Sequence, residues 1–462
     1  MHDVCLDLVY VVEEAINNGS SAYKDPNSKE AMYRAYLDVL QKIEETGYRA
    51  WLVGDTVRML EMGIQPDTIT LAIDTQDMYQ VSRILGTGTV DSRGPYPALR
   101  GELLGVTFRA FGLRGDTIED DLACRDLSIE AIAIRSDGGI VDPFGGRFDI
   151  RNRVIRLTGD NVDLIDADPL RIVRMLRFAA EFEMDIFWKS ESDVRAFLEV
   201  YADRMNDIPA ERWGREIMKG LHRRPYRFIE LCNDYRLIPY FLPELEELKS
   251  VYDSKDPKKS IYTHILEVLK VIEQRMDTRK IMQNDAFVLA GLFGMIGTRT
   301  LDGTDRTRLA DHLVNEYLTR WNVPSQMIDE VIAIINGYKK FYTPVNEEEF
   351  CRDVLDYTRE AVEIAIEFGW CIADAGGFID DVSDTLEANH WGLMQVLRRF
   401  DNVKLQTEGS TRYMTGREVM SLLNMKPGRR IGELLEGLDM AVGTGKVSSR
   451  AAAEDWLRAQ VS

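Results

Sequence analysis

The chain has 462 residues, of which 45% are hydrophobic and 29% are charged, so it can form about three domains with sizeable cores. Its formal net charge of −20 argues against a general nucleic-acid binder, because phosphate affinity depends on Lys and Arg, but a local basic strip remains compatible with an acidic body. The five cysteines form no CxxC pair, and no apolar run approaches the roughly 18 residues that span a membrane, so we expect a reduced, cytoplasmic protein without membrane contact.

Two amphipathic helices are predicted at the start of the chain. Residues 1–19 and residues 31–46 both place apolar side chains at helical spacing, and a polar stretch separates them. The first 16 residues also carry four carboxylates and no Lys or Arg, unlike a secretory signal. The second helix leads into an apolar run that we expect to be a strand, at 49–53.

The segment 49–74 has the pattern strand, glycine turn, helix, turn and strand. Gly54 ends the first strand, residues 57–62 have helical spacing, and residues 69–73 form the second strand. Such a unit commonly presents backbone N–H groups to a phosphate, although many glycine turns only reverse the chain. Both interpretations of this segment are open from the pattern alone.

Further elements follow in the first half of the chain. We expect a helix at 78–85, a Gly/Pro-rich stretch, a strand at 103–113 and a hairpin turn at 136–139. Helical patterns dominate after residue 155. In the helix at 166–182, Asp168 is the expected N-cap and Pro169 the expected first helical residue.

The same helix carries a basic ridge. Asp168 and Arg171 are three residues apart and therefore share a face. The ridge consists of Arg171, Arg174 and Arg177. These charges indicate either a solvated surface or a ligand-binding face.

These segments resemble the class II tRNA nucleotidyltransferases (CCA-adding enzymes) and the bacterial poly(A) polymerases of the polymerase-β-like superfamily. The family's LVGG-x-VRD is LVGDTVRM here, its EDDLARRDFTINALA is EDDLACRDLSIEAIA, and its EDPLRILRAIRFAA is ADPLRIVRMLRFAA. The tail TGREVM…KPGRRIGELL is also similar to the family tail. The matches occur in the family's order from about residue 40 to the end of the chain.

The resemblance implies an α+β fold. It consists of a nucleotidyltransferase head with a mixed five-stranded sheet and helices, followed by an all-helical neck, body and tail. An N-terminal helical extension (1–30) lies outside the resemblance. The implied domains are the head (31–150), a neck or RNA-binding helical domain (151–250), a degenerate HD-like helical domain (251–345) and a helical, tRNA-binding tail (346–462).

The resemblance also implies ligands and the residues that bind them. A nucleotide, ATP or CTP, is expected at Gly54, Arg58, Arg125, Asp126, Asp168, Arg171 and Arg174. The backbone of tRNA or another structured RNA is expected at Lys426, Arg429 and Arg430. The alternative for the tail is a plain helical hairpin whose Pro-Gly turn only reverses the chain.

The family's metal-binding positions are not carboxylates in this chain. Thr68 and Thr70 replace the two acidic residues of the D-x-D motif, and Leu104 replaces the third. Mg²⁺ requires hard, charged oxygen ligands, so we expect no metal site and no metal cofactor. Asp55, in place of a family glycine, would repel each phosphate charge by about 3 kcal/mol at about 5 Å and an effective dielectric near 20.

The segment 261–345 resembles an HD phosphohydrolase domain that has lost its metal ligands. His264 occupies the position of the first metal-binding histidine, but Gly294 and Met295 stand where the family has His and Asp. Neither holds a hydrolytic metal ion. We therefore expect His264 and His312 to be ordinary helix residues.

Three hypotheses about function follow. The first is a pseudo-nucleotidyltransferase that binds RNA or a nucleotide without transfer chemistry. The second is an active, divergent enzyme in which Asp55, Asp67, Asp74 or Glu102 holds Mg²⁺ near Arg125 and Arg171. The third is a structural subunit of a larger assembly. The sequence makes no prediction of the oligomeric state.

Overall fold

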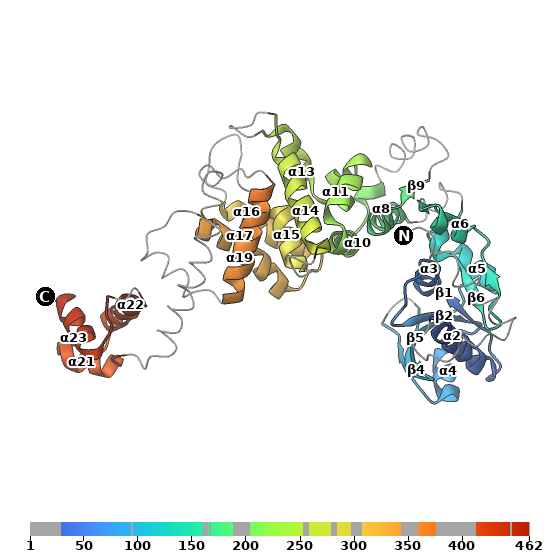
Figure 1. The fold of residues 1–462 in the computed structure, drawn as a ribbon, viewed down its shortest axis with the longest axis horizontal. Coiled ribbons are helices and arrows are strands. Elements are labelled where there is room, and N and C mark those ends of the chain that lie inside the picture. Colours follow the sequence, from blue (N-terminus) through green and yellow to red (C-terminus); the bar gives the residue numbers. More distant parts are fainter. Residues whose placement is uncertain are drawn as a thin grey trace. The chain divides into compact units, whose positions relative to one another are not determined.

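A computed structural model describes residues 29–93, 96–159, 165, 168–187, 204–252, 258–278, 284–296, 307–342, 359–375, 413–443 and 446–461. The chain forms two compact units, Met1–Ile208 and Pro209–Ser462, whose elements are labelled in Figure 1. The amphipathic helix expected at 1–19 lies outside the described residues.

The first unit contains a mixed sheet of seven strands in the order β3-β4-β5-β2-β1-β6-β7. β2 and β5 pair in parallel, and the other neighbours are antiparallel. The α+β fold class is therefore confirmed, but the expected number of five strands is wrong because the Gly/Pro-rich stretch contributes strands of its own. The strands are β1 (Ala50–Val53), β2 (Ile69–Ile73), β3 (Thr89–Asp91), β4 (Ala98–Leu103), β5 (Val106–Gly112), β6 (Ala133–Arg135) and β7 (Ile140–Val141).

Helices and a second, two-stranded sheet complete this unit (Figure 1). They are α2 (Lys29–Glu44), α3 (Asp55–Glu61), α4 (Met78–Leu85), α5 (Ile118–Ala123), the 3₁₀ turn η2 (Ser128–Glu130), α6 (Gly146–Arg151), β8 (Val154–Ile155), α8 (Leu170–Phe182) and β9 (Asp185–Ile186). The hairpin turn predicted at 136–139 is confirmed between β6 and β7, where Gly138 has φ 85°.

Alternation of side chains along the strands gives the large sheet two packed faces. Leu52, Leu71 and Phe108 are buried on one face. On the other face, Trp51 and Ala72 belong to a buried cluster that includes Ile118 and Leu122 of α5. The apolar side of α5 therefore packs against this face of the sheet.

A tight hairpin replaces the single strand expected at 103–113. β4 and β5 pair up to Leu103↔Val106, and the two residues between them have positive φ, 53° at Leu104 and 78° at Gly105. A two-residue turn with both φ positive is the type I′ geometry that matches strand twist. Leu104 is 59% exposed, because it lies at the turn and not within a strand.

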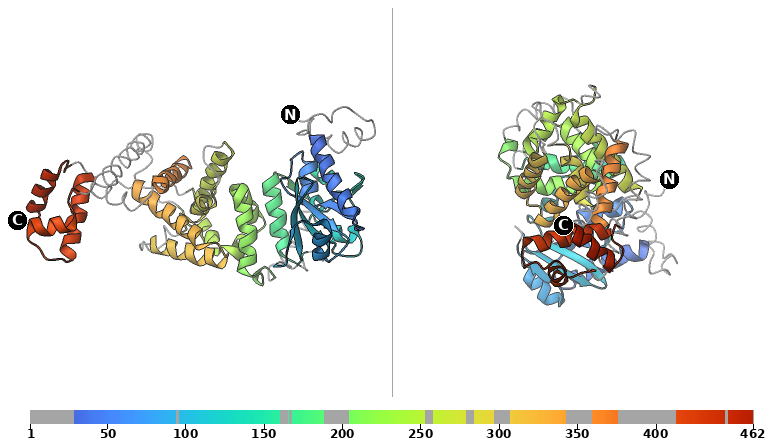
Figure 2. Two further views of the ribbon diagram at one scale, coloured as in Figure 1. Left: turned by 90° about the horizontal axis from the view of Figure 1, so that it is seen from below. Right: turned by 90° about the vertical axis from the view of Figure 1, so that its left-hand side faces the viewer.

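The described residues of the second unit form no β-strand beyond an isolated bridge, and Figure 2 shows its helices from two further sides. This part of the fold prediction is confirmed. The elements are α10 (Ala210–Arg223), α11 (Pro225–Asp234), α12 (Ile238–Phe241), α13 (Pro243–Glu247), η3 (Leu248–Ser250), α14 (Ile261–Asp277), α15 (Asp285–Phe293), α16 (Thr307–Arg320), α17 (Ser325–Tyr342), α19 (Arg359–Asp374), α21 (Gly416–Leu423), α22 (Arg429–Gly443) and α23 (Arg450–Ala459).

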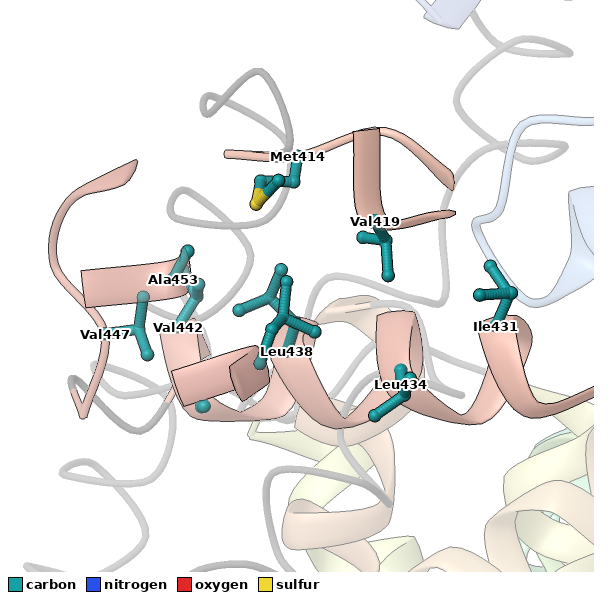
Figure 3. Packing of buried hydrophobic residues seen from close by; sticks show 10 residues of the cluster. Met414, Val419, Ile431, Leu434, Leu438, Val442, Val447 and Ala453 are labelled. Atoms are coloured by element: carbon teal, nitrogen blue, oxygen red, sulfur yellow. The ribbon is translucent and has the colours of Figure 1, made fainter. Parts of the chain in front are cut away.

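The three C-terminal helices share a small apolar core of their own (Figure 3). Val419 of α21, Leu434 and Leu438 of α22 and Leu457 of α23 are buried in it. Thr415 begins α21 with a capping box, in which its hydroxyl accepts from the Glu418 N–H and the Glu418 carboxylate accepts from the Thr415 N–H. Core and caps together explain why this segment forms a helical hairpin and a third helix.

Among the described residues, no helix combines the length and apolar character that crossing a bilayer requires.

Candidate functional site

Gly54 forms a turn between β1 and α3 that only glycine accommodates easily. Its φ is 64° and its ψ is −130°. A Cβ atom added here would lie 2.7 Å from Nη1 of Arg125 and 3.5 Å from Oε2 of Glu130. The absent side chain thus leaves the space that a guanidinium and a carboxylate approach.

Arg58 lies in a largely enclosed position on α3. Its Nε is paired with Oε1 of Glu130, and its Cζ lies 5.3 Å and 4.5 Å from the ring centroids of Phe178 and Phe182 on α8. Burial raises the pKa of Glu130 despite the attraction of Arg58. The predicted nucleotide-binding Arg58 is therefore already engaged by a carboxylate and two aromatic rings.

A buried carboxylate orients Arg125. Asp121 is 2% exposed, and its oxygens accept from Nη2 of Arg125 at 2.8 Å and from Nε of Arg114 at 3.0 Å. Burial by itself would raise the pKa of Asp121, but the attraction of Arg125 and Arg114 outweighs burial and lowers it. Asp121 remains ionised and fixes both arginines.

Four of the predicted nucleotide-binding residues form one charged cluster. Oδ1 of Asp126 lies 2.8 Å from Nε of Arg171, and its Oδ2 lies 2.6 Å from Nε of Arg174. Nη2 of Arg174 donates to Oδ2 of Asp168 at 2.7 Å. The arginine side chains are only 14% and 19% exposed, so this ridge is not a solvated surface, and the charges hold one another in place.

The start of α8 differs from the prediction by one residue. The helix begins at Leu170 and its N-cap is Pro169. Asp168 precedes the cap, and its carboxylate accepts from the Leu170 N–H at 3.3 Å. This is the bond that an N-cap carboxylate makes to the second helical residue, and Pro169 already has helical φ −60° and ψ −24°, so the capping role predicted for Asp168 is confirmed although the assigned helix begins one residue later.

The residues at the three metal positions do not fit a divalent cation. Thr68 is exposed in a bend before β2, Thr70 lies on β2, and Leu104 lies at the tip of the β4–β5 turn. On the neighbouring strand the register partner of Thr70 is Arg109, a cation. The hydroxyls of Thr68 and Thr70 are neutral, and Leu104 is aliphatic. These side chains therefore do not supply the anionic oxygens that Mg²⁺ prefers.

The carboxylates proposed as replacements do not converge among the described residues. Asp74 is held by Arg49, whose N–H and Nε donate at 2.7 Å and 2.9 Å. Asp67 lies near Tyr36 of α2, where it adds to the effect of burial in raising the pKa of that phenol. Glu102 is on β4, two strands and about 10 Å from β2.

Asp55 is the remaining candidate, and it also has a local role. Its carboxylate accepts from the Thr56 N–H at 2.9 Å, and its charge adds to the raised pKa of Glu130, which is due first to burial. The described residues contain no group of three or more His, Cys, Asp or Glu side chains placed to hold a metal ion.

In residues 261–345, where the resemblance implied a degenerate HD-like domain, two of the positions that correspond to metal ligands, His264 and Met295, are buried. His264 is fully buried in α14, whereas the His312 side chain is 71% exposed on α16. Met295 is buried next to Tyr338, with Sδ 4.0 Å from the phenol oxygen. A Cβ on Gly294 would lie 2.6 Å from the Ala290 carbonyl oxygen, so this position has no room for a histidine.

The predicted RNA-binding residues lie where the chain enters α22, Lys426 in the turn after α21 and Arg429 and Arg430 at the first two positions of α22, and we call this group the basic turn (Lys426, Arg429 and Arg430). The Arg429 side chain is 95% exposed. Glu433 partners both arginines, at 3.4 Å from Nε of Arg429 and 3.0 Å from Nη1 of Arg430. One carboxylate facing two exposed guanidiniums leaves this turn with a net positive charge.

Sequence reasoning missed two residues that organise the site. Glu130 was noticed only as a departure from the family's Asn, and Asp121 was not singled out. The four-residue spacing between Asp121 and Arg125 on a helix could have suggested their ion pair. Nothing local in the sequence connects Glu130 with Arg58, which are 72 residues apart.

Comparisons with known proteins show which proteins this chain is similar to. Residues 38–156 match the family described as the Poly A polymerase head domain. The A-adding tRNA nucleotidyltransferase of Deinococcus radiodurans is 27% identical over 357 residues, which cover 73% of this chain and 79% of that protein.

Two solved structures share the fold over most of the chain. The Bacillus stearothermophilus CCA-adding enzyme in complex with CTP has a TM-score of 0.65 and 20% identity over 93% of this chain and 97% of that one. The Thermotoga maritima CCA-adding enzyme complexed with tRNA has a TM-score of 0.57 and 19% identity over 92% of this chain and 95% of that one.

Proposed function

Because this chain belongs to the class II tRNA nucleotidyltransferase and poly(A) polymerase family, we propose that it is an RNA-binding member without nucleotide-transfer activity. A single observation carries this proposal. The three positions at which the family places metal-binding carboxylates are occupied by Thr68, Thr70 and Leu104, and the register places Arg109 beside the central one.

The chemistry makes this replacement decisive. Nucleotidyl transfer needs two divalent ions that activate the attacking hydroxyl and neutralise the leaving pyrophosphate. A threonine hydroxyl is neutral and can only complete a shell that carboxylates already anchor. Loss of one well-placed electrostatic group typically lowers a rate by about 10²–10³, and here three positions are neutral. The positions of Asp67, Asp74 and Glu102 give no support to a shifted metal site.

RNA binding is supported by what remains of the site and by the relatives. The Deinococcus relative is named as a tRNA nucleotidyltransferase, and the Thermotoga structure contains tRNA. We assign recognition of a nucleotide base to the cluster of Asp126, Asp168, Arg171 and Arg174, whose donors and acceptors are fixed by one another. We assign contacts with the RNA backbone to the basic turn, because exposed Lys and Arg supply affinity for phosphate.

The domain boundaries and the HD-like origin of residues 251–345 are part of the same proposal. The apolar surroundings of Met295 and the lack of space at Gly294 support a domain kept for packing. The separate apolar core of the three C-terminal helices supports a distinct tail.

Two assays on the full-length protein test the proposal. In the first, tRNA lacking its CCA end is incubated with labelled CTP or ATP and Mg²⁺ or Mn²⁺, with the Bacillus stearothermophilus CCA-adding enzyme as a positive control. We expect no incorporation. In the second, the mobility of the same tRNA is measured at moderate salt, and we expect a shift at micromolar protein.

Each contrary result has a defined meaning. Robust incorporation that persists in T70A would show that transfer chemistry survives at another place. The absence of a mobility shift would instead favour a structural subunit of a larger assembly.

A further inference from the structure

Glu130 is paired with Arg58 and lies, together with Arg125, close to Gly54. Its Oε1 is paired with Nε of Arg58, while its Oε2 and Nη1 of Arg125 both reach the space where a Cβ of Gly54 would be. Arg125 also acts on the charge of this carboxylate, since it is among the groups that favour the ionised form of Glu130. The space over the glycine thus holds a carboxylate that belongs to the protein and is paired with Arg58.

Neither arginine is free to exchange this partner for another. The guanidinium of Arg58 lies against the rings of Phe178 and Phe182, and its side chain is 10% exposed. Arg125 is fixed by the buried Asp121. A phosphate that entered this space would face Glu130, and the two nearby guanidiniums already have carboxylate partners, Glu130 for Arg58 and Asp121 for Arg125.

Asp55 adds to the negative charge at the same place. It immediately follows Gly54, is exposed, and lies close enough to Glu130 to oppose its ionisation. Two carboxylates near one glycine turn make the local field unfavourable for a ligand with several negative charges.

We propose that the Glu130 carboxylate is an internal substitute for a bound phosphate and excludes polyphosphates, including nucleoside triphosphates, from the space over Gly54. The inference rests on the proposed function, because it assumes that the head binds nucleic-acid ligands. It goes further by assigning specificity: the head admits ligands that place no polyphosphate beside Arg58 and Arg125.

Isothermal titration of the full-length protein with ATP and with tripolyphosphate tests this assignment. Both titrations omit divalent cations, so that any binding reports the protein's own charges. The E130Q change keeps the shape of the side chain and removes its charge, and we expect it to raise the affinity for both ligands at least tenfold. E130D, which keeps the charge, and E119Q, which removes an exposed charge from α5, should resemble the wild type.

The double variant R58Q/E130Q distinguishes release of Arg58 from a general loss of negative charge. If Glu130 neutralises Arg58, the gain seen in E130Q disappears in the double variant. A gain that persists there, or a wild type that binds ATP as tightly as E130Q, would overturn the inference.

Two further measurements keep the result decisive. Should E130Q not fold, as judged by circular dichroism, the wild type is titrated alone. Saturable micromolar binding that R125Q abolishes would contradict the inference, and its absence up to millimolar ligand would support it. The tRNA mobility shift is measured with the same proteins. If no protein shifts the tRNA, the proposed RNA-binding function is contradicted, but the comparison of ATP affinities still tests the role of Glu130.

Discussion

Replacement of Gly54 by alanine should destabilise the head for two separable reasons. The first is conformational, because φ 64° with ψ −130° is a region where a non-glycine residue costs about 1–3 kcal/mol. The second is steric, because the new Cβ would lie 2.7 Å from Nη1 of Arg125. If the guanidinium moves away, it weakens a charge-assisted interaction with buried Asp121 worth about 1.5–3 kcal/mol. We expect a total loss of about 3–4 kcal/mol in the free energy of opening this region.

Hydrogen exchange of the β1 and α3 amides, followed by mass spectrometry on the full-length protein, measures this loss locally. A local measure is needed because a chain with two compact units need not unfold in one step. Gly86 provides the matched control, since it has φ 66° but no atom within 4 Å of its Cβ position. G86A should destabilise only the region around α4, by about 1–2 kcal/mol.

Two results would refute this reasoning. One is a loss in G54A no larger than the loss in G86A, which would mean that Arg125 does not lie over the turn. The other is strict additivity of G54A and R125Q, because residues in contact should couple by about 0.5–3 kcal/mol in a double-mutant cycle.

Three further predictions concern the second unit. Replacing the cations of the basic turn by glutamine should weaken tRNA binding and reduce the slope of log affinity against log salt by about 2–3, at about 0.9 per lost phosphate contact. Filter binding at several salt concentrations measures this slope. As a control, replacing the cations of α2 by glutamine should leave the slope nearly unchanged. Hydrogen bonds from Thr415 and then Arg450 lower the pKa of Glu418 to about 2, which is below its value in the unfolded chain. The contribution of Glu418 to tail stability is therefore complete above about pH 5 and is lost as the pH falls toward 2. Hydrogen exchange of the α21 amides, measured as a function of pH, checks this, and E418Q should abolish the dependence. In α10, the Cβ of G214A would collide with Trp321, which follows α16, and we expect a loss of about 1–3 kcal/mol that thermal unfolding detects.

Hydrophobic patterns with clear flanking signals predicted regular elements well. β2 and α4 were predicted with their observed limits, 69–73 and 78–85, since β2 is a short apolar run after Pro66 and α4 has apolar residues at helical spacing before Gly86. The β4–β5 turn was missed because Leu-Gly lacks the Asn-Gly or Asp-Gly signal of a two-residue hairpin. The alternation of side chains also continues across it, so the pattern resembles one strand.

The composition of the site was easier to predict than its connections. The structure brings Asp126, Asp168, Arg171 and Arg174 together as the resemblance implied. It also shows that Arg58 is occupied by Glu130. Such pairing depends on tertiary packing between η2 and α3, and no local pattern contains that information. The roles of these residues in binding stay predictions.

The geometry of the β4–β5 turn determines what repair of the active site would require. Carboxylates introduced at 68 and 70 would lie two residues apart, in the bend before β2 and on β2 itself, but one introduced at 104 would begin from a backbone with φ 53° at an exposed hairpin tip. Its oxygen atoms would extend into solvent. A designer who wished to revive catalysis would have to rebuild the loop itself, because point substitutions alone leave the third ligand out of reach.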